Sequence, residues 1–492
     1  MVKIENFVKE YTKAITEGYA AIFAGAGLSR SSGYIDWKNL LKPMAEEIGL
    51  DVEKENDLVA VAQYYRNAKG NRNQINQAIL NNFTAETKEN KNINIITELP
   101  ISTYWTTNYD CLIEEGLKAN NRKADVKVTE KNLSNNICDR DAVVYKMHGD
   151  VRDPDNAVLT KDDYDKYGVS HSLFRTALRG DLISKTFLFI GFSFEDPNLD
   201  YIISSIKVLL DESVRDHYCI LRKICKSDYD DEQQFIYDSV KQDLRIKDLQ
   251  RYGIQTILID DFREITSILL KIKRCCLLKN IFVSGSSAAG YLPSGWDETK
   301  FSNFLFKLGR SLVEKGYKIV SGFGLGVGSL IVNGVLEEIM SSKYKHLDEY
   351  LSLRPFPQIA VGSVTREELW QQYREDMIDD VGIVIFLFGN KLVDGKIINA
   401  NGVLQEFDIA KQKNKYVIPV GGTGGASELI YAEVEQHIDE YSYLKDFLDV
   451  LSLSTANPEK LTQAILEIIN NIGKIELNDY REGIYVEKTS VF

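Results

Sequence analysis

The sequence lacks several features that would place the protein in a well-defined class. Its 492 residues carry a formal net charge of −13, so the overall positive charge typical of nucleic-acid binding is absent. No apolar run is long enough to span a bilayer. The first residues, Met1 to Asn6, lack the basic and apolar layout of a signal peptide. We therefore expect a cytoplasmic protein that binds neither a membrane nor nucleic acid.

Paired cysteines and flexible linkers are also missing. No two of the six cysteines have the two-residue spacing typical of a zinc site, so we interpret them as reduced structural thiols and expect no metal. There is no proline- or glycine-rich linker and no low-complexity segment, which indicates closely coupled domains. The cysteines are Cys111, Cys138, Cys219, Cys225, Cys275 and Cys276.

The chain contains two series of short apolar runs separated by helical patterns. A length of 492 residues and an apolar fraction of 44% allow two or three domains with large cores. Most of the runs are continuous rather than alternating, as expected for parallel strands covered on both faces. This pattern predicts an α/β protein with two Rossmann-like, doubly wound domains and mostly parallel sheets. We place the domains at residues 1–274 and 275–492, with the boundary within 271–279.

The expected elements can be stated by residue. A first helix carries apolar residues from Ile4 to Ile15 and stops at Gly18. Strands of the first domain are expected at 20–24, 103–107, 142–147, 187–192, 218–222 and 254–259. In the second domain, strands are expected at 281–284, 317–321, 358–362, 382–388 and 416–420, with helices at 299–315, 328–340, 366–378 and 403–413.

The first expected strand runs into a glycine loop, Gly25-Ala26-Gly27-Leu28-Ser29. Glycines let the backbone approach a pyrophosphate, and a helix N-terminus after the loop favours negative charge. Ser29 adds a hydroxyl donor. The alternative is a tight strand–helix turn without a ligand, because short glycine patterns are common.

Two further strands end in polar residues. Asn108 and Asp110 follow one of them, and His148 ends another. Ligands of open α/β sheets bind at the carboxyl ends of the strands. Asn108 can hold a ribose hydroxyl or a water, and a neutral His148 can accept a proton from either. Asp110 can hold a carboxamide, orient Asn108, or merely cap the following helix in an Asx turn.

A fourth segment, Gly191-Phe192-Ser193, closes the strand expected at 187–192. Gly191 and Ser193 are candidates for the adenosine side of a dinucleotide. A strand end followed by the turn at Pro197 explains the segment equally well.

These four segments, in this order, resemble the motifs of the sirtuin family. The resemblance covers roughly residues 1–270 and implies an NAD-binding domain that breaks the nicotinamide–ribose bond. It implies that His148 is the general base and that Asn108 positions the water or ribose. It also implies phosphate contacts from the glycine loop, namely from Gly25, Ala26, Gly27 and Ser29.

The sequence departs from the protein-deacylating sirtuins in one respect. Those enzymes carry a four-cysteine zinc module after the catalytic histidine, whereas only Cys219 and Cys225 stand between His148 and the expected boundary. That module helps to shape the acyl-lysine groove, so water is the favoured acceptor here. We therefore expect hydrolysis of NAD to ADP-ribose and nicotinamide, with an NAD-dependent deacylase as the alternative. A nucleotide-binding scaffold with a degenerate first domain is a further alternative, against which Asn108 and His148 argue.

The second domain also has glycine-rich strand ends. Gly285 and Ser286 follow one expected strand, and alternating glycines that include Gly324 and Gly326 follow the next. Both loops are candidate phosphate or ribose cradles, although a flexible strand–helix turn would look the same. Gly402 opens a later helix whose first turn holds Glu406, a possible acceptor for ribose hydroxyls or a simple helix-start carboxylate.

This second half resembles the Rossmann-like domain shared by lysine-decarboxylase-like phosphoribohydrolases and nucleotide sensors, the SMF/DprA–LOG family. Enzymes of this type carry a double glycine before the position of Gly402 and then a threonine. Here the run reads Asn399-Ala400-Asn401-Gly402-Val403. The missing glycines and threonine favour a domain of the SLOG type that binds a nucleotide without cleaving it.

The combination of both domains resembles the NAD-hydrolysing effectors of the bacterial Thoeris antiphage system. This resemblance implies activation by a cyclic ADP-ribose isomer made by a TIR-domain partner, and a homotetramer. It also implies activator contacts from Arg374, Lys391 and Glu406. Depletion of NAD would then halt the infected cell. Which isomer binds, and how the subunits are arranged, stays open at this level.

Overall fold

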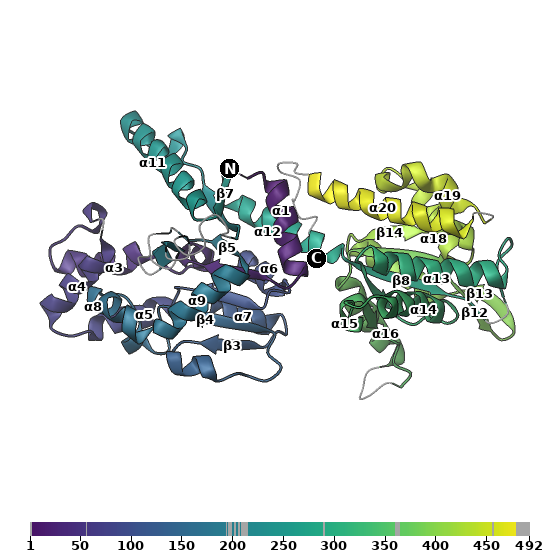
Figure 1. Cartoon of the computed structure of the whole chain (residues 1–492), viewed down its shortest axis with the longest axis horizontal. Helices are drawn as coiled ribbons and strands as arrows, with labels where there is room; N and C mark the ends of the chain where they lie inside the picture. Colours follow the sequence, from purple (N-terminus) through teal and green to yellow (C-terminus); the bar gives the residue numbers. More distant parts are fainter. Residues whose placement is uncertain are drawn as a thin grey trace. The chain divides into compact units, whose positions relative to one another are not determined.

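The computed structural model describes residues 2–55, 57–192, 194, 199–200, 203–204, 207, 215–288, 291–359, 365–454 and 457–478 of the chain. These residues form two compact units, the first ending at Lys273 and the second beginning at Arg274 (Figure 1). The division falls within helix α12 (Arg263–Leu277). Each unit has its own parallel sheet and is described separately.

The first unit is built on a seven-stranded sheet in which every pairing is parallel. Strands β1 and β5 are buried along their whole length, which explains their uninterrupted apolar sequences. Across the sheet the strands are β3 (Ala124–Lys127), β4 (Ala142–Lys146), β2 (Thr103–Thr106), β1 (Ala20–Ala24), β5 (Thr186–Ile190), β6 (His217–Arg222) and β7 (Ile254–Ile259).

Helix α1 (Ile4–Thr16) covers this sheet with its apolar stripe. Phe7 and Val8 are fully buried, and the Tyr11 hydroxyl donates to the Ala21 carbonyl of β1 at 2.8 Å. Gly18 adopts a φ of +78° just after the helix, a conformation that favours glycine. The helix and its stop therefore follow the predicted pattern.

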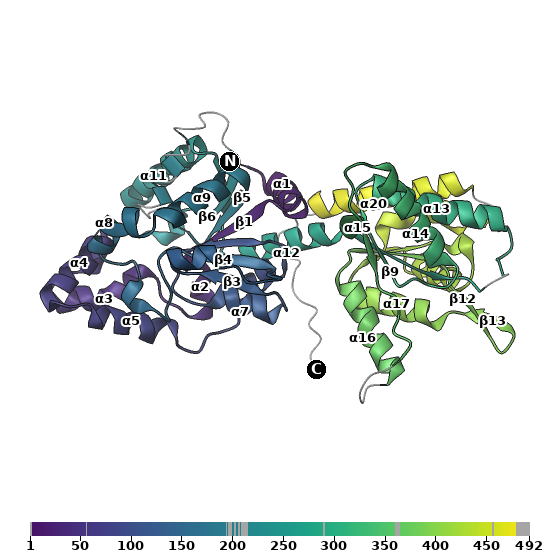
Figure 2. The ribbon, with the colours of Figure 1, turned by 60° about the horizontal axis from the view of Figure 1, so that its bottom comes forward.

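A group of helices is inserted between β1 and β2. The helices of this insertion are α3 (Trp37–Glu47), α4 (Leu58–Lys69), α5 (Asn73–Phe83) and α6 (Lys91–Glu98). The remaining helices of the unit that the argument uses are α7 (Leu112–Ala119), α8 (Lys161–Ser170), α9 (Ser172–Ser184) and α11 (Glu232–Arg251). Figure 2 shows α3, α4 and α5 beside α8 at one end of the unit. Leu41 and Ile79 of these helices belong to an apolar core that also includes Tyr109 and Val151, which follow β2 and β4.

The second unit has a five-stranded sheet that is also parallel throughout. Its strands, in spatial order, are β10 (Leu351–Leu353), β9 (Lys318–Ser321), β8 (Asn280–Ser286), β11 (Ile383–Phe388) and β14 (Tyr416–Pro419). Helices α13 (Glu298–Glu314), α14 (Val327–Ser341), α16 (Arg366–Asp379), α17 (Asn401–Gln412), α18 (Ala426–Gln436) and α20 (Pro458–Asn478) accompany it. The predicted fold class, two α/β units with parallel sheets, is confirmed.

One predicted strand of the second unit is wrong. Residues 358 and 359 form a bend, and residues 360–362 lie outside the described part of the chain. The edge strand is instead β10, only three residues long. Pro355 and Pro357 stand directly before the expected strand, and proline has no N–H to donate to a sheet.

Two other features of the sheets were not predicted. Edge strand β3 contains a buried ion pair, Asp125 with Lys127, so it does not look like an apolar strand. An antiparallel hairpin, β12 (Asn390–Val393) and β13 (Lys396–Asn399), projects from the second unit after β11 (Figures 1 and 2). Among the described residues, no helix is long and apolar enough to cross a membrane.

Candidate functional site

Each sheet has a topological switch point, which is the place where the chain stops adding strands on one side of the first strand and begins adding them on the other side. In the first unit it lies between β1 and β5, and in the second between β8 and β11. Open α/β sheets bind ligands in the crevice outside the carboxyl ends of such strands. The predicted site residues fall largely at these two places.

At the first switch point two glycine loops touch each other. The backbone N–H of Gly25 donates to the Ile190 carbonyl, and that of Gly27 donates to the Gly191 carbonyl, both at 2.9 Å. A Cβ on Gly25 would lie 2.4 Å from the Gly191 oxygen. Gly191 has a φ of +65°, and a Cβ there would lie 2.2 Å from the Leu28 nitrogen. The close approach of the two loops therefore accounts for these glycines before any ligand is considered.

The helix expected after this loop is very short. Helix α2 comprises only Ala26–Ser29 and passes directly into a 3₁₀ turn. A single turn sums few peptide dipoles, so the predicted attraction of a helix N-terminus for phosphate is weak here. Ala26 is partly buried and Gly27 is exposed. Ser193, predicted for the adenosine side, lies outside the described residues.

Asn108 is held by two hydrogen bonds from its amide nitrogen. Nδ2 donates to the Gly25 carbonyl at 3.1 Å and to Ser29 Oγ at 3.0 Å. The opposite amide orientation would set Oδ1 against the Gly25 carbonyl, which also only accepts. Both amide hydrogens are therefore used, and Oδ1 is the atom that can accept a hydrogen bond from a water or a ribose hydroxyl.

Ser29 links Asn108 to Asp110 through a second hydrogen bond. Its hydroxyl donates to Asp110 Oδ2 at 2.8 Å, while Asp110 Oδ1 accepts the Leu112 N–H at 3.1 Å. Burial raises the pKa of Asp110, against the opposing effect of the bond from Ser29. Asp110 thus both accepts the first N–H of α7 in an Asx turn and anchors an Asn108–Ser29–Asp110 relay. The relay was not predicted, although an orienting role for Asp110 was.

His148 lies beside Asn108 at the same edge of the sheet. Thr106 of β2 is in register with Lys146 of β4, so Asn108 and His148 each stand two residues beyond paired positions. Neighbouring strands are about 4.8 Å apart, so the register places both residues at one edge of the sheet.

Aromatic rings surround the imidazole of His148, which is only 2% exposed. The centroids of Trp37, Tyr164 and Tyr167 lie 6.3, 5.6 and 6.2 Å from it. Tyr167 is fixed in turn, because its hydroxyl donates to the Met147 carbonyl at 3.2 Å and its ring stacks on His171. Trp37 comes from the inserted helix α3, so the insertion contributes directly to the site.

A buried ionic cluster lies beneath these residues. Lys146 is fully buried, and its Nζ donates to Asp150 at 2.5 Å and to the carbonyl of Asp110 at 2.6 Å. Burial acts to lower the pKa of Lys146, but attraction to Glu114 and Asp150 outweighs it and the pKa is raised. Burial likewise acts to raise the pKa of Asp150, yet bonds from Arg152 and Lys146 hold it at about 2.

The same cluster contains possible metal ligands. Ligand atoms of Cys111, Glu114 and Asp150 lie within 4.8 Å of one another. Lys146 and Arg152 already supply the opposite charge, with ion pairs to Glu114 at 3.2 Å each. The acidic groups are therefore balanced by protein cations. A lysine at the end of an apolar strand was the only sequence signal for this cluster.

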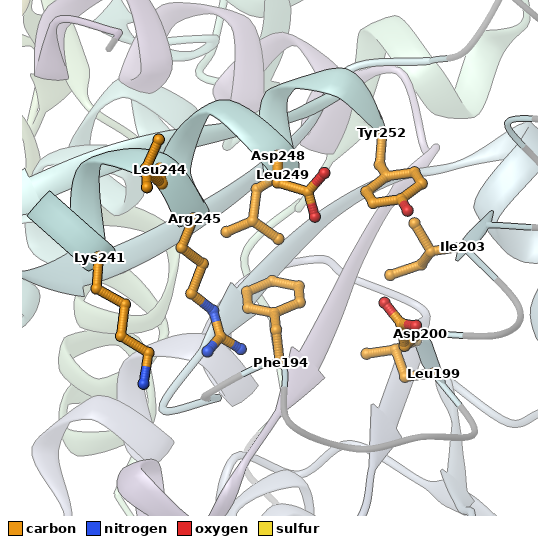
Figure 3. A pocket seen from close by; sticks show the side chains of 10 residues that line it. All are labelled: Phe194, Leu199, Asp200, Ile203, Lys241, Leu244, Arg245, Asp248, Leu249 and Tyr252. Atoms are coloured by element: carbon orange, nitrogen blue, oxygen red, sulfur yellow. The ribbon is translucent and has the colours of Figure 1, made fainter.

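The first unit contains a cavity of about 430 Å³ (Figure 3). Lys241 and Arg245 of α11 line one side, and Asp200 and Tyr252 line the other, with Phe194 between them. None of the described residues predicted for NAD lines it.

Glycines also bring two loops together at the second switch point. A Cβ on Gly324 would lie 2.0 Å from the Gly285 oxygen, and one on Gly326, whose φ is +74°, would lie 2.7 Å from the Ser287 oxygen. The Ser287 N–H donates to the Leu325 carbonyl at 2.7 Å. The alternating glycines after β9 therefore pack against the end of β8, and Ser286 follows Gly285 there.

Arg374, Gly402 and Glu406, which were predicted as activator contacts, are brought together. Glu406 Oε2 accepts the Ser284 hydroxyl at 2.5 Å, and Oε1 lies 3.5 Å from Arg374 Nε. Burial raises the pKa of Glu406 to about 7, although Ser284 and Arg374 both act to lower it. A Cβ on Gly402 would lie 3.0 Å from Arg374 Nη2, so this glycine makes room for the guanidinium.

The guanidinium of Arg374 is further held by aromatic rings. Its Cζ lies 5.0 Å from the centroid of Phe356 and 5.9 Å from that of Trp370, within range of cation–π attraction. Lys391, the third predicted activator contact that the resemblance implied, lies on the hairpin that follows β11. It is partly buried on β12, in register with Ile398 of β13.

Three phenylalanines at strand ends adopt a left-handed backbone. Phe194, Phe323 and Phe388 have φ values of +58°, +57° and +56°. They follow or end β5, β9 and β11, on the sheet edges where the candidate sites lie. A left-handed backbone is uncommon for a bulky residue, and in proteins generally such strained residues cluster at functional sites. No sequence pattern predicts these conformations.

Comparisons with known proteins match both units. Residues 102–249 match a SIR2-like domain, and residues 264–472 match the Sir2- and TIR-associating SLOG family. The "NAD(+) hydrolase ThsA" of Bacillus cereus (strain MSX-D12) is 47% identical over 472 residues, which is 95% of this chain and 98% of that protein. The protein of the same name from Cytobacillus dafuensis is 44% identical over 475 residues, 94% of this chain and 96% of that protein.

A more distant relative matches over less of the chain. The "Defense-associated sirtuin 2" of Bacillus subtilis is 28% identical over 215 residues, 42% of this chain and 21% of that protein. The nearly full-length relatives confirm the resemblance to the Thoeris effectors that the motifs indicated. The chain belongs to the ThsA family.

Proposed function

We propose that the first unit hydrolyses NAD to ADP-ribose and nicotinamide. The observation that carries this proposal is that Asn108 and His148 follow neighbouring strands at one sheet edge, with the Asn108 amide fixed by the Gly25 carbonyl and by Ser29. The name shared by the relatives that match 94–95% of the chain supports the same activity.

The residues suggest how the reaction proceeds. The bond between nicotinamide and C1′ of the ribose breaks, nicotinamide leaves with the bonding electrons, and water adds to C1′. Asn108 Oδ1 accepts a hydrogen bond from the water or a ribose hydroxyl and thereby sets its position. His148 accepts the proton that the water loses. The aromatic rings around His148 limit the access of bulk water to this base.

We further propose that the second unit controls this activity. A cyclic ADP-ribose isomer, made by a TIR-domain partner, would bind at the end of β8 near Arg374, Glu406 and Lys391. The matched family description, which mentions association with both Sir2 and TIR, supports this, as does the cluster of Ser284, Arg374 and Glu406 beside the switch point. An activator shifts the equilibrium between an inactive and an active state only if it binds the two states with different affinity. The activator site of the second unit must therefore be coupled to the NAD site of the first unit.

The biological role follows from that control. A homotetramer in the bacterial cytoplasm would stay inactive until the signal appears, and would then deplete NAD and stop the infected cell. These statements on assembly, location and outcome belong to the proposal and rest on the family membership.

The test is release of nicotinamide from NAD by the purified full chain, with and without cyclic ADP-ribose isomers. We expect release only with the activating isomer, and loss of release in Asn108→Ala and in His148→Ala. His437→Ala serves as the control, because this histidine is exposed and its Nδ1 contacts only the Glu433 carbonyl of α18 among the described residues. Glu406→Ala should abolish activation at ordinary activator concentration.

Two results would contradict the proposal. Activation of Glu406→Ala at the same activator concentration would remove the sensor assignment. Binding of NAD without any release, together with turnover of an acylated peptide, would identify a deacylase instead.

A further inference from the structure

Asn390 occupies an unusual position that the sequence did not reveal. It is the first residue of β12 and directly follows Phe388 and Gly389, with φ values of +56° and +98°. These two left-handed residues turn the chain sharply at the end of β11. Asn390 therefore stands at the switch point of the second sheet, and it is only 2% exposed.

The orientation of its side chain is fixed by the end of β8. Oδ1 accepts the Ala288 N–H at 2.8 Å, and the Asn390 backbone carbonyl accepts the Ser286 hydroxyl at 2.9 Å. If the amide were turned over, its NH₂ group would face the Ala288 N–H, and two donors would meet. The amide nitrogen Nδ2 consequently points away from Ala288.

Nδ2 is buried and, among the described residues, has no hydrogen-bond partner. An unsatisfied buried donor destabilises the folded chain, and the great majority of such groups are paired in native proteins. The exceptions call for an explanation, such as a bound molecule that completes the pairing. Here the donor is held rigidly at a place where α/β sheets receive ligands.

The polar groups nearby belong to the predicted activator site. Ser284 and Ser286 stand two residues apart on β8, so their side chains lie on the same face of the strand. Ser284 bonds to Glu406, and Ser286 bonds to the Asn390 backbone. A spacing of two residues along a strand is about 7 Å. Asn390 and the Glu406–Arg374 pair are thus close enough to contact one nucleotide together.

We propose that Asn390 is an activator-binding residue whose Nδ2 donates a hydrogen bond to an oxygen acceptor of the bound nucleotide. The proposal rests on the function proposed above for the second unit. A ribose oxygen and a phosphate oxygen are the acceptors that such a ligand offers. Because the donor is already oriented, it adds affinity without further ordering of the side chain.

The test is Asn390→Asp, measured by calorimetric titration of the full chain with the activating cyclic ADP-ribose isomer. The substitution keeps the acceptor for Ala288 and replaces the donor by a second acceptor of the same size. We expect the dissociation constant to rise by roughly 10- to 100-fold, the equivalent of losing a buried bond and leaving its partner unpaired. At saturating activator, the rate of nicotinamide release should return to that of the parent chain.

A matched control comes from the same hairpin. Asn399 is in register with Asn390 on β13 and is exposed, so Asn399→Asp makes the same change in charge without removing a buried donor. Its dissociation constant should stay within about twofold of that of the parent chain, since exposed charges act weakly. The urea midpoint of each variant reports whether the second unit remains folded. If Asn390→Asp does not fold, Asn390→Ala replaces it.

Three outcomes decide the matter. A selective rise of the dissociation constant in the Asn390 variants supports the proposal. Unchanged affinity in a folded Asn390→Asp or Asn390→Ala chain overturns it, because Nδ2 then serves only a bound water. If the parent chain itself binds none of the isomers, the function proposed for the second unit fails and this inference falls with it.

Discussion

A buried ion pair lies near the candidate site in each unit, and the two pairs differ in the state of their carboxyl groups. In the first unit, Asp150 receives bonds from Lys146 and Arg152, and its pKa is held at about 2. In the second, Glu406 lies 3.5 Å from Arg374, and burial raises its pKa to about 7. The first carboxyl group is therefore fully charged near neutral pH, whereas the second is close to half-protonated.

This difference matches the tasks proposed for the two units. A catalytic site gains from groups that are fixed before the substrate arrives, and the satisfied Lys146 cluster supports the loop that carries Asp110. A sensor gains from groups whose charge or pairing changes when a ligand binds. Glu406 is such a group, and so is the Asn390 amide nitrogen, which has no hydrogen-bond partner in the described part of the chain.

Removing the cation of each pair is the strongest test of this comparison. Lys146→Met leaves Asp150 and Glu114 buried without their main counter-charge, and we expect it to lower the free energy of unfolding by about 3–5 kcal/mol. Arg374→Met should cost less near pH 6, because Glu406 can take up a proton instead. Urea unfolding, followed by hydrogen exchange of peptides from β4 and β8, measures each unit separately.

The control for these variants is an exposed pair. Lys69→Met removes the partner of Glu47 at the surface, and its effect should stay below about 1 kcal/mol. Equal losses for Lys146→Met and Arg374→Met would show that the two buried pairs do not differ as described.

The pH dependence of stability offers a second test. The pKa of Glu406 rises from 4.5 to about 7 on folding, so between these values the folded chain holds a proton that the unfolded chain has lost. Its contribution to stability is present below pH 4.5 and declines as the pH rises to about 7, by about 3 kcal/mol in all. Glu406→Gln should flatten this part of the profile for the second unit.

Asp150 should behave in the opposite way. Its pKa falls from 3.8 to about 2 on folding, so its contribution is present above pH 3.8 and is lost as the pH falls toward 2. Asp150→Asn should therefore differ from the parent chain less at pH 2 than at pH 5. Urea midpoints between pH 2 and pH 8 give both profiles, and an unchanged slope between pH 5 and 7 in Glu406→Gln would refute the account of Glu406.

The sequence predicted the parts of the molecule that depend on local pattern. Strand β1 is a continuous apolar run, both β1 and β7 have the predicted bounds, and Gly18 ends α1 as expected. The three-residue strand β10 and the charged edge strand β3 have no such pattern. Asn108 and His148 could be placed at one edge because both follow strands, and a parallel sheet brings strand ends together.

Contacts between distant segments could not be predicted in this way. Ser29 and Asp110 are 81 residues apart, and only the fold shows that their side chains are bonded. The unsatisfied donor of Asn390 is defined by what surrounds it, so nothing in the sequence near 390 distinguishes it from a surface asparagine. The sequence predicted glycine loops at the strand ends as phosphate cradles. Their observed role, the close packing of two loops, could not be predicted because each glycine packs against a loop that is distant in the sequence.

That packing role yields a third prediction, in which the two units should behave alike. Gly25→Ala places a Cβ 2.4 Å from the Gly191 oxygen, and Gly324→Ala places one 2.0 Å from the Gly285 oxygen. Because backbone must move in both cases, each should destabilise its own unit by about 1–3 kcal/mol. The urea midpoint of each unit measures this.

Glycines in open helices provide the matched controls. Nothing lies within 4 Å of a Cβ on Gly180 of α9 or Gly473 of α20. Alanine at either position should leave stability unchanged or raise it by about 0.4–1 kcal/mol. A loss in these controls as large as that in the loops would mean that close packing is not the reason for the loop glycines.

The smallest expected effect concerns the relay of the first unit, which has no counterpart in the second. Ser29→Ala removes the hydroxyl between Asn108 and Asp110 but leaves the bond from Asn108 to the Gly25 carbonyl. We expect the rate of nicotinamide release to fall about tenfold, the equivalent of one neutral hydrogen bond, with activator affinity unchanged. Ser31→Ala, which removes only a 3.5 Å contact to a backbone carbonyl, is the control and should keep the full rate. A full rate in Ser29→Ala would mean that the Gly25 carbonyl alone positions Asn108, and that Asp110 serves only to accept the Leu112 N–H at the start of α7.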